Sequence, residues 1–538
     1  METRGNVVKV DLTKYDRNTL EDEFVKVSSK VNELEAKLKW YEGQMRLANQ
    51  KKYGASSEKT DTDSGQIYMF NEAELEASDV EPEPELKKIH KRGVRKKGNK
   101  EYLTEDLPVE VIEYKLSAEE QTCPECQGPM HEMSKEIRKE LKVIPAQVMV
   151  TQHIRYVYAC RQCEKEGITV PIITAPMPKP VIPNSLASPS LISFIMTRKY
   201  EQALPLYRQE QQFHYYGLEI KRQNLANWMI YSSEHHLTHL YERMHELLIA
   251  KEVIHADETT IQVLNEDGKT PESKSYMWMY RTTKGDDPIV LYEYQPGRSA
   301  RYPVSFLKGF RGYVHVDGYE AYGKLLRGPD GEDTGVRLVG CLAHSRRKWD
   351  EALKSLPKGV DSSTLAAKKG LSYCNKLFDL ERKFENYTPE KRYLARIKYS
   401  KPLLDDYFEW ALKENAVALP KGPLGKALTY NINQRAKLEG FLLDGRLELS
   451  NNRAERAIKP FVIGRKNWTF ANCVKGAQSS AVIYSIIETA KASKLHTFNY
   501  ITYLLEQLPN IDVTDNAELD KLLPWMGQLP ESCYCKKK

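Results

Sequence analysis

Several features of common protein classes are missing from this sequence of 538 residues. It contains no run of about 18 apolar residues, so we expect no membrane-spanning helix and no membrane partner. The opening segment METRGNVVKVDLTKYDR lacks the apolar stretch of a signal peptide, which predicts a cytoplasmic protein. The patterns GxxxxGK(S/T), HExxH and GxSxG are also absent. Their absence argues against P-loop ATP hydrolysis, zinc proteolysis and serine-hydrolase chemistry.

Cysteine is scarce, with nine residues, but four of them form two CxxC pairs. The first pair is Cys123 and Cys126, and the second is Cys160 and Cys163. Each pair places two thiolates on one tight turn, and two such turns complete a tetrahedral zinc site. Four sulfur ligands leave no open position for chemistry, so the pattern predicts one structural Zn²⁺. We assign a four-cysteine zinc-binding β module to residues 103–170.

Charge is nearly balanced overall, at +6, but it is strongly segregated in one segment. Residues 72–85 hold seven acids and no base, whereas residues 87–100 hold eight bases and no acid. This pattern predicts a charged linker over residues 53–102. Its basic half could bind phosphates, and the alternative is a linker that only aids solubility.

The N-terminal region shows the spacing of a coiled coil. Apolar residues within residues 20–45 recur at alternating steps of four and three, with charged residues between them. They are Leu20, Phe24, Val27, Val31, Leu34, Leu38, Tyr41 and Met45. We predict a coiled coil over residues 1–52 that forms a homodimer or a larger homo-oligomer. The alternative is a helix that packs on its own chain.

The next segments read as a linker and a helical region. Residues 171–190 are rich in proline and predict a linker, and residues 191–248 follow a helical pattern. Two helices joined at Tyr216 and Gly217 predict a helix-turn-helix-like DNA-binding region. The second helix opens with long polar side chains suited to base edges, namely Lys221, Arg222, Gln223 and Asn224. The alternative is an ordinary helical hairpin with a basic face.

From residue 249 onward the pattern changes to short β-branched and aromatic runs. KEVIHADETTIQVL, SYMWMYRTT and IVLYEYQP predict three strands, and GYVHVDGY and VRLVGCL predict two more. Three antiparallel strands followed by strands alternating with helices is the order of a ribonuclease-H-like α/β fold. We therefore predict a catalytic domain at 249–485 with a helical insertion at 357–440, and a C-terminal helical tail at 486–538. The fold class is thus multidomain, with this ribonuclease-H-like core preceded by the coiled coil, the zinc module and the helical region.

Three carboxylates occupy positions that this fold would bring together. Asp257 lies in the first strand, Asp317 ends the fourth, and Glu455 lies in the late helix that begins at LSNNRAER. Converging carboxylates repel one another unless a divalent cation neutralises them. Such a cluster suits two Mg²⁺ ions, with Mn²⁺ as a substitute, for in-line phosphoryl transfer.

Each acid also has an ordinary structural alternative. Asp317 precedes a glycine, as in many turns, and Glu455 could pair with Lys459 one helical turn later. Glu258 neighbours Asp257 but points to the other face of the strand, so it is the weaker candidate.

At this point the sequence resembles the DDE transposases encoded by the bacterial insertion-sequence sixty-six family. The resemblance runs nearly end to end. It is carried by KKYGASSEKT, YVYACRQC, LPLYRQEQ with RQNLANWM, HADETT, VHVDGYEAYG, CLAHSRRKWDEA, LSNNRAERAIKPFVIGRKNW and LLPWMGQ. One departure is visible, because Lys221 stands where the family's second helix commonly opens with a serine-like cap.

The resemblance implies roles for particular residues. Asp257, Asp317 and Glu455 would form the catalytic triad and bind two Mg²⁺ ions, and the four CxxC cysteines would bind zinc. Further DNA contacts are implied for His344, Arg346, Arg347, Arg453, Arg456, Arg465, Lys466 and Trp468. Packing within the fold is the alternative for each of these.

The resemblance also implies a function. The protein would bind the terminal inverted repeats of an insertion sequence, cleave the 3′ ends and transfer them to target DNA. It would act in the bacterial cytoplasm in association with the nucleoid. Its partners would be double-stranded DNA and further copies of itself, with small accessory proteins of the same element as a further implied partner. The alternatives are a ribonuclease-H-like nuclease without strand transfer and a non-catalytic zinc-containing DNA-binding regulator.

Overall fold

The computed structural model describes residues 147–159, 165, 172–328, 330–355 and 365–535. The predicted coiled coil, the charged linker and the four CxxC cysteines lie outside these residues. Across the helices in the described ranges, none is long and apolar enough to cross a membrane.

A short hairpin precedes the main body of the fold. Strand β1 (Val157–Ala159) pairs antiparallel with β2 (Ile172–Thr174). The predicted boundary between residues 170 and 171 therefore separates two paired strands. Residues 172–174, which we expected in the proline-rich linker, belong instead to this hairpin, because β2 finds its hydrogen-bond partner in β1.

Four helices and a π-helical turn follow the hairpin. The helices are α5 (Pro189–Tyr200), α6 (Leu206–Tyr215), α7 (Arg222–Ser232) and α8 (Thr238–Ile249), with a π-helical turn at Ser233–Leu237. Gly217 lies in the turn between α6 and α7 with φ of 78°, a conformation that glycine adopts without strain.

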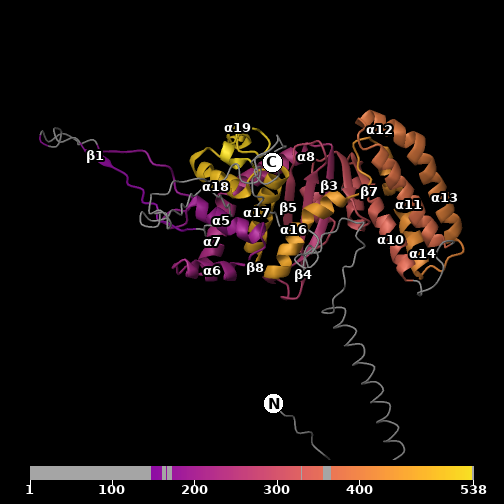
Figure 1. Cartoon of the computed structure of the whole chain (residues 1–538), viewed down its shortest axis with the longest axis horizontal. Coiled ribbons are helices and arrows are strands. Elements are labelled where there is room, and N and C mark those ends of the chain that lie inside the picture. Colours follow the sequence, from indigo (N-terminus) through magenta and orange to yellow (C-terminus); the bar gives the residue numbers. More distant parts are fainter. Residues whose placement is uncertain (1–146, 160–164, 166–171, 329, 356–364, 536–538) are drawn as a thin grey trace, which may run out of the picture. The chain divides into compact units, whose positions relative to one another are not determined.

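The central feature is a six-stranded mixed sheet (Figure 1). Its strands are β3 (Val253–Asn265), β4 (Lys274–Thr282), β5 (Val290–Gln295), β6 (Gly312–Val316), β7 (Val336–Gly340) and β8 (Ala471–Cys473). The order is β5-β4-β3-β6-β7, and β8 pairs with the far end of β3. Strand β4 is antiparallel to both β3 and β5, whereas β6 is parallel to β3 and β7 is parallel to β6. The five strands predicted from the sequence are β3 to β7.

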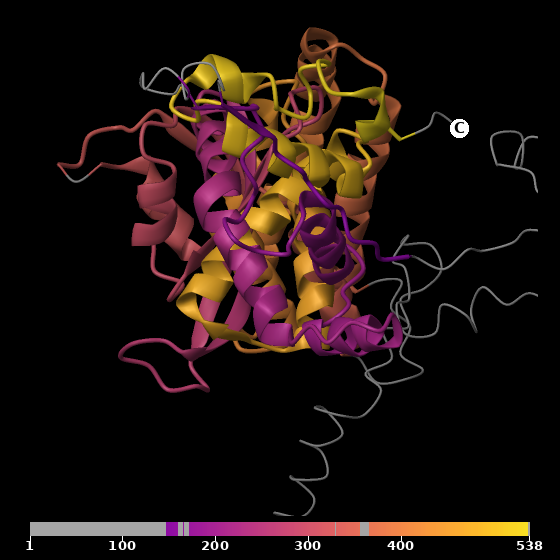
Figure 2. The same ribbon diagram turned by 90° about the vertical axis from the view of Figure 1, so that its left-hand side faces the viewer.

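Helix α17 (Val474–Ala492) covers the edge strand β5 (Figure 2). The Ser485 Oγ accepts the Tyr292 N–H at 2.7 Å, and the Thr489 Oγ1 accepts the Val290 N–H at 3.0 Å. These hydroxyls satisfy backbone groups that an uncovered edge would expose. The predicted boundary between residues 485 and 486 falls inside this helix.

The remaining C-terminal residues form short helices. Helix α18 (Thr497–Gln507) packs against α5 and α17, and α19 (Asn516–Asp520) packs against α8.

The helical insertion follows α10 (Leu342–Lys354) and has a core of its own. Its helices are α11 (Ala366–Lys383), α12 (Pro389–Ala395), α13 (Lys401–Asn415), α14 (Pro423–Asn433) and α15 (Arg435–Leu438). The Trp349 indole N–H donates to the Tyr407 hydroxyl at 2.9 Å in this core. Through α15 the insertion contacts β7, which places it beside the strand end from which α10 starts (Figure 1).

Candidate active site

Two neighbouring parallel strands deliver the two aspartates. His255 of β3 lies opposite His315 of β6 in the register. Asp257 and Asp317 each follow their histidine by two residues, so Asp257 within β3 lies level with Asp317, which directly follows β6. The sequence therefore fixes their mutual position once β3 and β6 pair.

The third carboxylate comes from a helix that crosses the sheet. Helix α16 (Asn452–Trp468) packs on β3 and β4 and carries Glu455 in its first turn. Ala454, Ala457, Ile458 and Phe461 are buried on its inner face. This amphipathic face fixes the rotation of the helix and thereby brings Glu455 to the strand ends.

The three carboxylates interact electrostatically. Burial raises the pKa of Asp257 well above its ordinary value, and the negative charges of Glu258, Asp317 and Glu455 raise it further. The Glu258 amide N–H donates to Asp257 Oδ1 at 2.9 Å and opposes that rise. Asp317 and Glu455 thus lie close enough to Asp257 for their charges to act on it.

The residue after Asp317 is a glycine for a steric reason. Gly318 does not adopt a positive φ, but a Cβ there would lie 2.7 Å from Cε2 of Tyr430 in α14. The Tyr319 amide N–H donates to Asp317 Oδ1 at 2.8 Å, as in an Asx-turn. Asp317 therefore does form the turn that was the alternative to a catalytic role, and the same hydrogen bond orients its carboxylate.

Glu455 interacts with α10 rather than with its own helix. Its Oε1 lies 3.7 Å from His344 Nδ1, and its Oε2 lies 3.6 Å from an Nη of Arg347. In the described part of the chain neither Glu455 Oε1 nor His344 Nδ1 has a hydrogen-bond partner, although both atoms are buried. The expected alternative, a pair with Lys459, is not formed.

These groups fit a divalent cation. Cys341, His344 and Glu455 can each present a ligand atom within 4.8 Å of the others. A buried acid with a raised pKa and a buried carboxylate oxygen without a partner both gain from a positive ion. Carboxylate oxygens are the ligands that Mg²⁺ prefers, so the donor set of Asp257, Asp317 and Glu455 suits that ion. Cys341 is not among the metal-binding residues predicted from the sequence.

Glu258 turns away from this cluster. Its carboxylate accepts the Tyr322 hydroxyl at 2.5 Å and two N–H groups of Arg298 at 2.5 and 2.9 Å. Arg298 in turn stacks over the Tyr319 ring, 3.7 Å from its centroid. These contacts satisfy Glu258 on the opposite side of β3.

Several implied DNA contacts instead have partners within the fold. Arg453 Nε donates to Glu448 Oε1 at 2.6 Å, and Arg465 Nη1 donates to Thr260 Oγ1 at 2.9 Å. Arg346 Nε donates to Asn375 Oδ1 at 2.8 Å. Trp468 packs edge-on against Phe461.

Arg347, Arg456 and Lys466 have exposed side chains. Of these three, Arg347 lies beside Glu455, so it is the arginine best placed to meet a phosphate at the carboxylate cluster.

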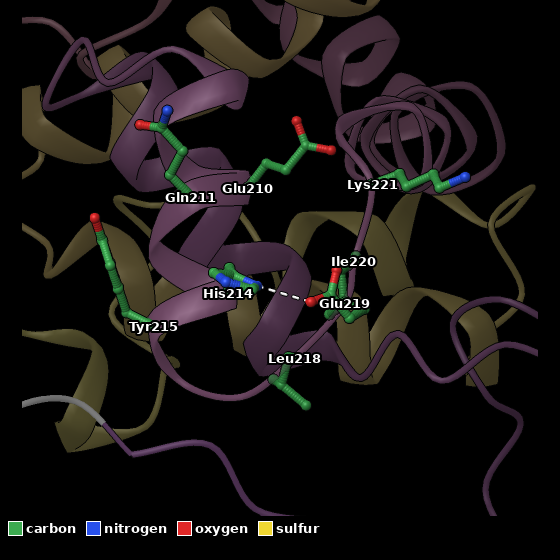
Figure 3. Close-up of a pocket in the computed structure, with 8 residues that line it drawn as sticks. All are labelled: Glu210, Gln211, His214, Tyr215, Leu218, Glu219, Ile220 and Lys221. Carbon is green, nitrogen blue, oxygen red and sulfur yellow. Dashed lines mark hydrogen bonds and ion pairs between the residues drawn. The ribbon is translucent and has the colours of Figure 1, made fainter.

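The predicted recognition residues begin α7 at the surface. Lys221, Arg222, Gln223 and Asn224 are all exposed, and Lys221 holds the N-cap position without a side-chain capping bond. A hollow of about 400 Å³ is lined by α6 and by the segment that leads to Lys221 (Figure 3). Within it the His214 ring points toward Glu219, with a Nδ1 to Oε1 distance of 2.7 Å (Figure 3).

Three further residues near the carboxylates were missed in the sequence. His255 and His315 are buried and stacked, and the Asn451 side chain contacts His255 rather than capping α16. A signal was available, because a histidine precedes both aspartates by two residues in HADET and VHVDGY.

Comparison with known proteins gives the family. Residues 184–479, more than half of the chain, match the family described as "Transposase IS66 family". The chain belongs to the IS66 transposase family. It is therefore a transposase, an enzyme of DNA transposition, and it has the divalent-metal dependence and the DNA substrate of that family.

Other segments of this transposase match companion families. Residues 120–164 match the zinc-finger binding domain of transposase IS66, and this range includes all four CxxC cysteines. Residues 485–525 match the IS66 C-terminal element, and residues 40–112 match "Transposase C of IS166 homeodomain".

Three proteins of Sinorhizobium fredii are similar to the transposase over most of its length. The uncharacterized protein y4jD is 30% identical over 76% of this chain and 79% of its own length. The uncharacterized protein y4qI is 31% identical over 77% and 75%, and y4hP is 28% identical over 75% and 73%.

Proposed function

We propose that this transposase cleaves the 3′ ends of its insertion sequence and joins them to target DNA at the cluster of Asp257, Asp317 and Glu455. The observation that carries the proposal is the parallel register of β3 with β6, which sets Asp257 beside Asp317, together with the packing of α16, which carries Glu455, on β3 and β4. The strand order β5-β4-β3-β6-β7, with three antiparallel and two parallel strands, supports a ribonuclease-H-like core for the catalytic domain.

The three carboxylates would hold two Mg²⁺ ions, for which Mn²⁺ would substitute. When bound, these ions would activate the attacking water or 3′-hydroxyl and stabilise the leaving oxygen. The carboxylates themselves make no covalent bond to DNA in this chemistry. His344 and Arg347 lie beside Glu455, where they suit contact with the scissile phosphate.

Other parts of the chain would recognise the ends. The exposed start of α7 suits contact with the terminal inverted repeats. The zinc module at 103–170, which would fold around one structural Zn²⁺, would add a second contact with the DNA. The predicted coiled coil at 1–52 would pair two protomers so that both element ends are held together. Accessory proteins of the same element and association with the nucleoid also belong to this proposal.

The test is an assay in vitro with labelled element-end DNA, Mg²⁺ and a target plasmid. The wild type is compared with Asp257→Asn and with the control Asp286→Asn, which alters an exposed loop aspartate. We expect nicked ends and joined products from the wild type and the control, and DNA binding without either product from Asp257→Asn.

Other results would contradict the proposal. Nicking without joining, even with accessory proteins added, would indicate a nuclease. Binding without any product in Mg²⁺ or Mn²⁺ would indicate a regulator. Cleavage by Asp257→Asn would remove Asp257 from the site.

A further inference from the structure

A buried polar network lies directly beneath the carboxylate cluster. The rings of His255 and His315 stack with their centroids 4.3 Å apart and their planes 10° apart. Both side chains are fully buried, and they face each other across the parallel pairing of β3 with β6. Because each ring precedes an aspartate by two residues, the stack lies at the base of both carboxylates.

The hydrogen bonds indicate which ring nitrogens carry protons. Asn451 Nδ2 donates to the Ala256 carbonyl at 2.8 Å, which leaves its Oδ1 to accept from His255 Nδ1 at 2.9 Å. His315 Nε2 accepts the Glu448 amide N–H at 3.2 Å. His255 therefore donates through Nδ1, and His315 accepts through Nε2.

Asn451 connects this pair to the other two elements of the site. Its carbonyl accepts the Glu455 amide N–H at 3.1 Å, which begins α16, and its own amide N–H donates to Cys341 Sγ at 3.1 Å. Cys341 holds the N-cap position of α10, the helix that carries His344. Asn451 thus contacts β3 through its side chain, and α16 and the start of α10 through its backbone.

The side chain of Asn451 does not perform the usual task of its position. An asparagine at an N-cap ordinarily accepts a helix amide and contributes about 1 kcal/mol to helix stability. In α16 no such bond is made, because the side chain turns inward to His255 and Ala256. The lost capping bond points to a role for Asn451 at the carboxylates.

We propose that His255, His315 and Asn451 are positioning residues that set the spacing of Asp257, Asp317 and Glu455 for divalent metal binding. This inference rests on the proposed two-metal function. The stack fixes the separation of the two strand ends, and Asn451 fixes the start of α16 against them. Groups that orient metal ligands from behind typically change metal affinity by about 10- to 100-fold when removed.

The experiment uses the full chain and Mn²⁺ alone as the probe, with bound Mn²⁺ counted by electron paramagnetic resonance. The variants are Asn451→Ala and His255→Phe, the second of which keeps a stacked ring but removes the donor to Asn451. Asn431→Ala is the matched control, because Asn431 is also a fully buried asparagine that donates to a backbone carbonyl at 2.8 Å, within α14. Thermal unfolding and the Mg²⁺ dependence of end cleavage are measured in parallel.

We expect Asn451→Ala and His255→Phe to weaken Mn²⁺ binding about 10-fold or more and to raise the Mg²⁺ concentration for half-maximal cleavage similarly. Asn431→Ala should lower only the unfolding temperature. If both variants bind Mn²⁺ as the wild type does, the positioning role is wrong. If Asn451→Ala does not fold, the Mn²⁺ affinity of His255→Phe decides the question.

The design separates this proposal from the function on which it rests. Comparison with Asp257→Asn shows whether the wild type binds Mn²⁺ through Asp257. If it does but yields no cleaved ends, the transposition chemistry is contradicted. The Mn²⁺ affinities of the variants would still decide the positioning role. A wild type without Asp257-dependent Mn²⁺ binding would overturn the positioning role.

Discussion

His344 Nδ1 lies 3.7 Å from Glu455 Oε1, and each of these buried atoms lacks a hydrogen-bond partner among the described residues. They come from α10 and α16, two helices whose starts lie about a hundred residues apart in the chain and meet only at the sheet edge. A cation at this point would satisfy both atoms, which makes His344 the best candidate for a functional residue beyond the three carboxylates.

Replacing His344 tests that role. His344→Ala should slow end cleavage about 10-fold or more, because Glu455 loses the neighbour that faces its free oxygen. DNA binding should remain close to that of the wild type. Rates are compared with Glu351→Gln, which alters an exposed acid on the same helix; equal rates for both variants would exclude His344 from the site.

Lys221 tests whether the start of α7 contacts DNA. Lys221→Ala should weaken binding to all sequences and reduce the slope of log affinity against log salt by about one, because one phosphate contact is lost. Titrations at several salt concentrations measure this slope. Lys308→Ala, at another exposed lysine, is the control and should leave the slope unchanged.

Arg465 is expected to stabilise the fold rather than to bind DNA. Its guanidinium donates to Thr260 and, at 3.3 Å, to Thr259, so it ties α16 to β3. Arg465→Ala should lower the free energy of unfolding by about 2 kcal/mol. Thr260→Val should remove part of the same free energy, so the double variant should lose less than the sum. Additive losses, measured by urea unfolding, would argue against this pair.

Glu293 predicts a pH dependence of stability. Burial raises its pKa from 4.5 to about 7, so the folded protein holds this proton more tightly than the unfolded chain. The resulting stabilisation of the folded protein is fully present below pH 4.5 and is lost as the pH rises through 7. It corresponds to about 3 kcal/mol of unfolding free energy. Glu293→Gln should therefore be more stable than the wild type at pH 8, with little difference at pH 4.5. Glu242→Gln, on the exposed side of α8, should retain the wild-type profile.

Zinc content tests the CxxC assignment. Native mass spectrometry should find one Zn²⁺ per chain, and Cys160→Ser should abolish stoichiometric binding because the site loses one of four thiolates. Chelation should weaken DNA binding. Cys535→Ser, at an exposed cysteine near the C-terminus, is the control and should retain the metal. A zinc content far from one per chain would contradict the assignment.

Much of the architecture around the site follows from local sequence patterns. The alternating and β-branched runs identify β3 to β7, and LSNNRAER marks the start of α16. The three acids stand out because Asp257 lies within an apolar strand, Asp317 directly follows a strand and Glu455 lies at a helix start. These features depend on residues near one another in the chain, and local backbone preferences are enough to predict them.

The partners of individual side chains do not follow from such patterns. Arg465 and Arg347 both look like DNA contacts in the sequence, yet one is bound to Thr260 and the other lies beside Glu455. Only the packing of α10 and α16 on the sheet distinguishes them.

The sequence by itself determined the candidate residues for the chemistry, namely the three carboxylates and the four CxxC cysteines, and the motifs of the family. The tertiary structure alone decided that Asp257 feels the charges of Asp317 and Glu455, and that Ser485 and Thr489 cover β5. It also joined His255 to Asn451 across 196 residues. The physical reason is that side-chain chemistry belongs to each residue, whereas burial and electrostatic coupling arise only when distant segments pack together.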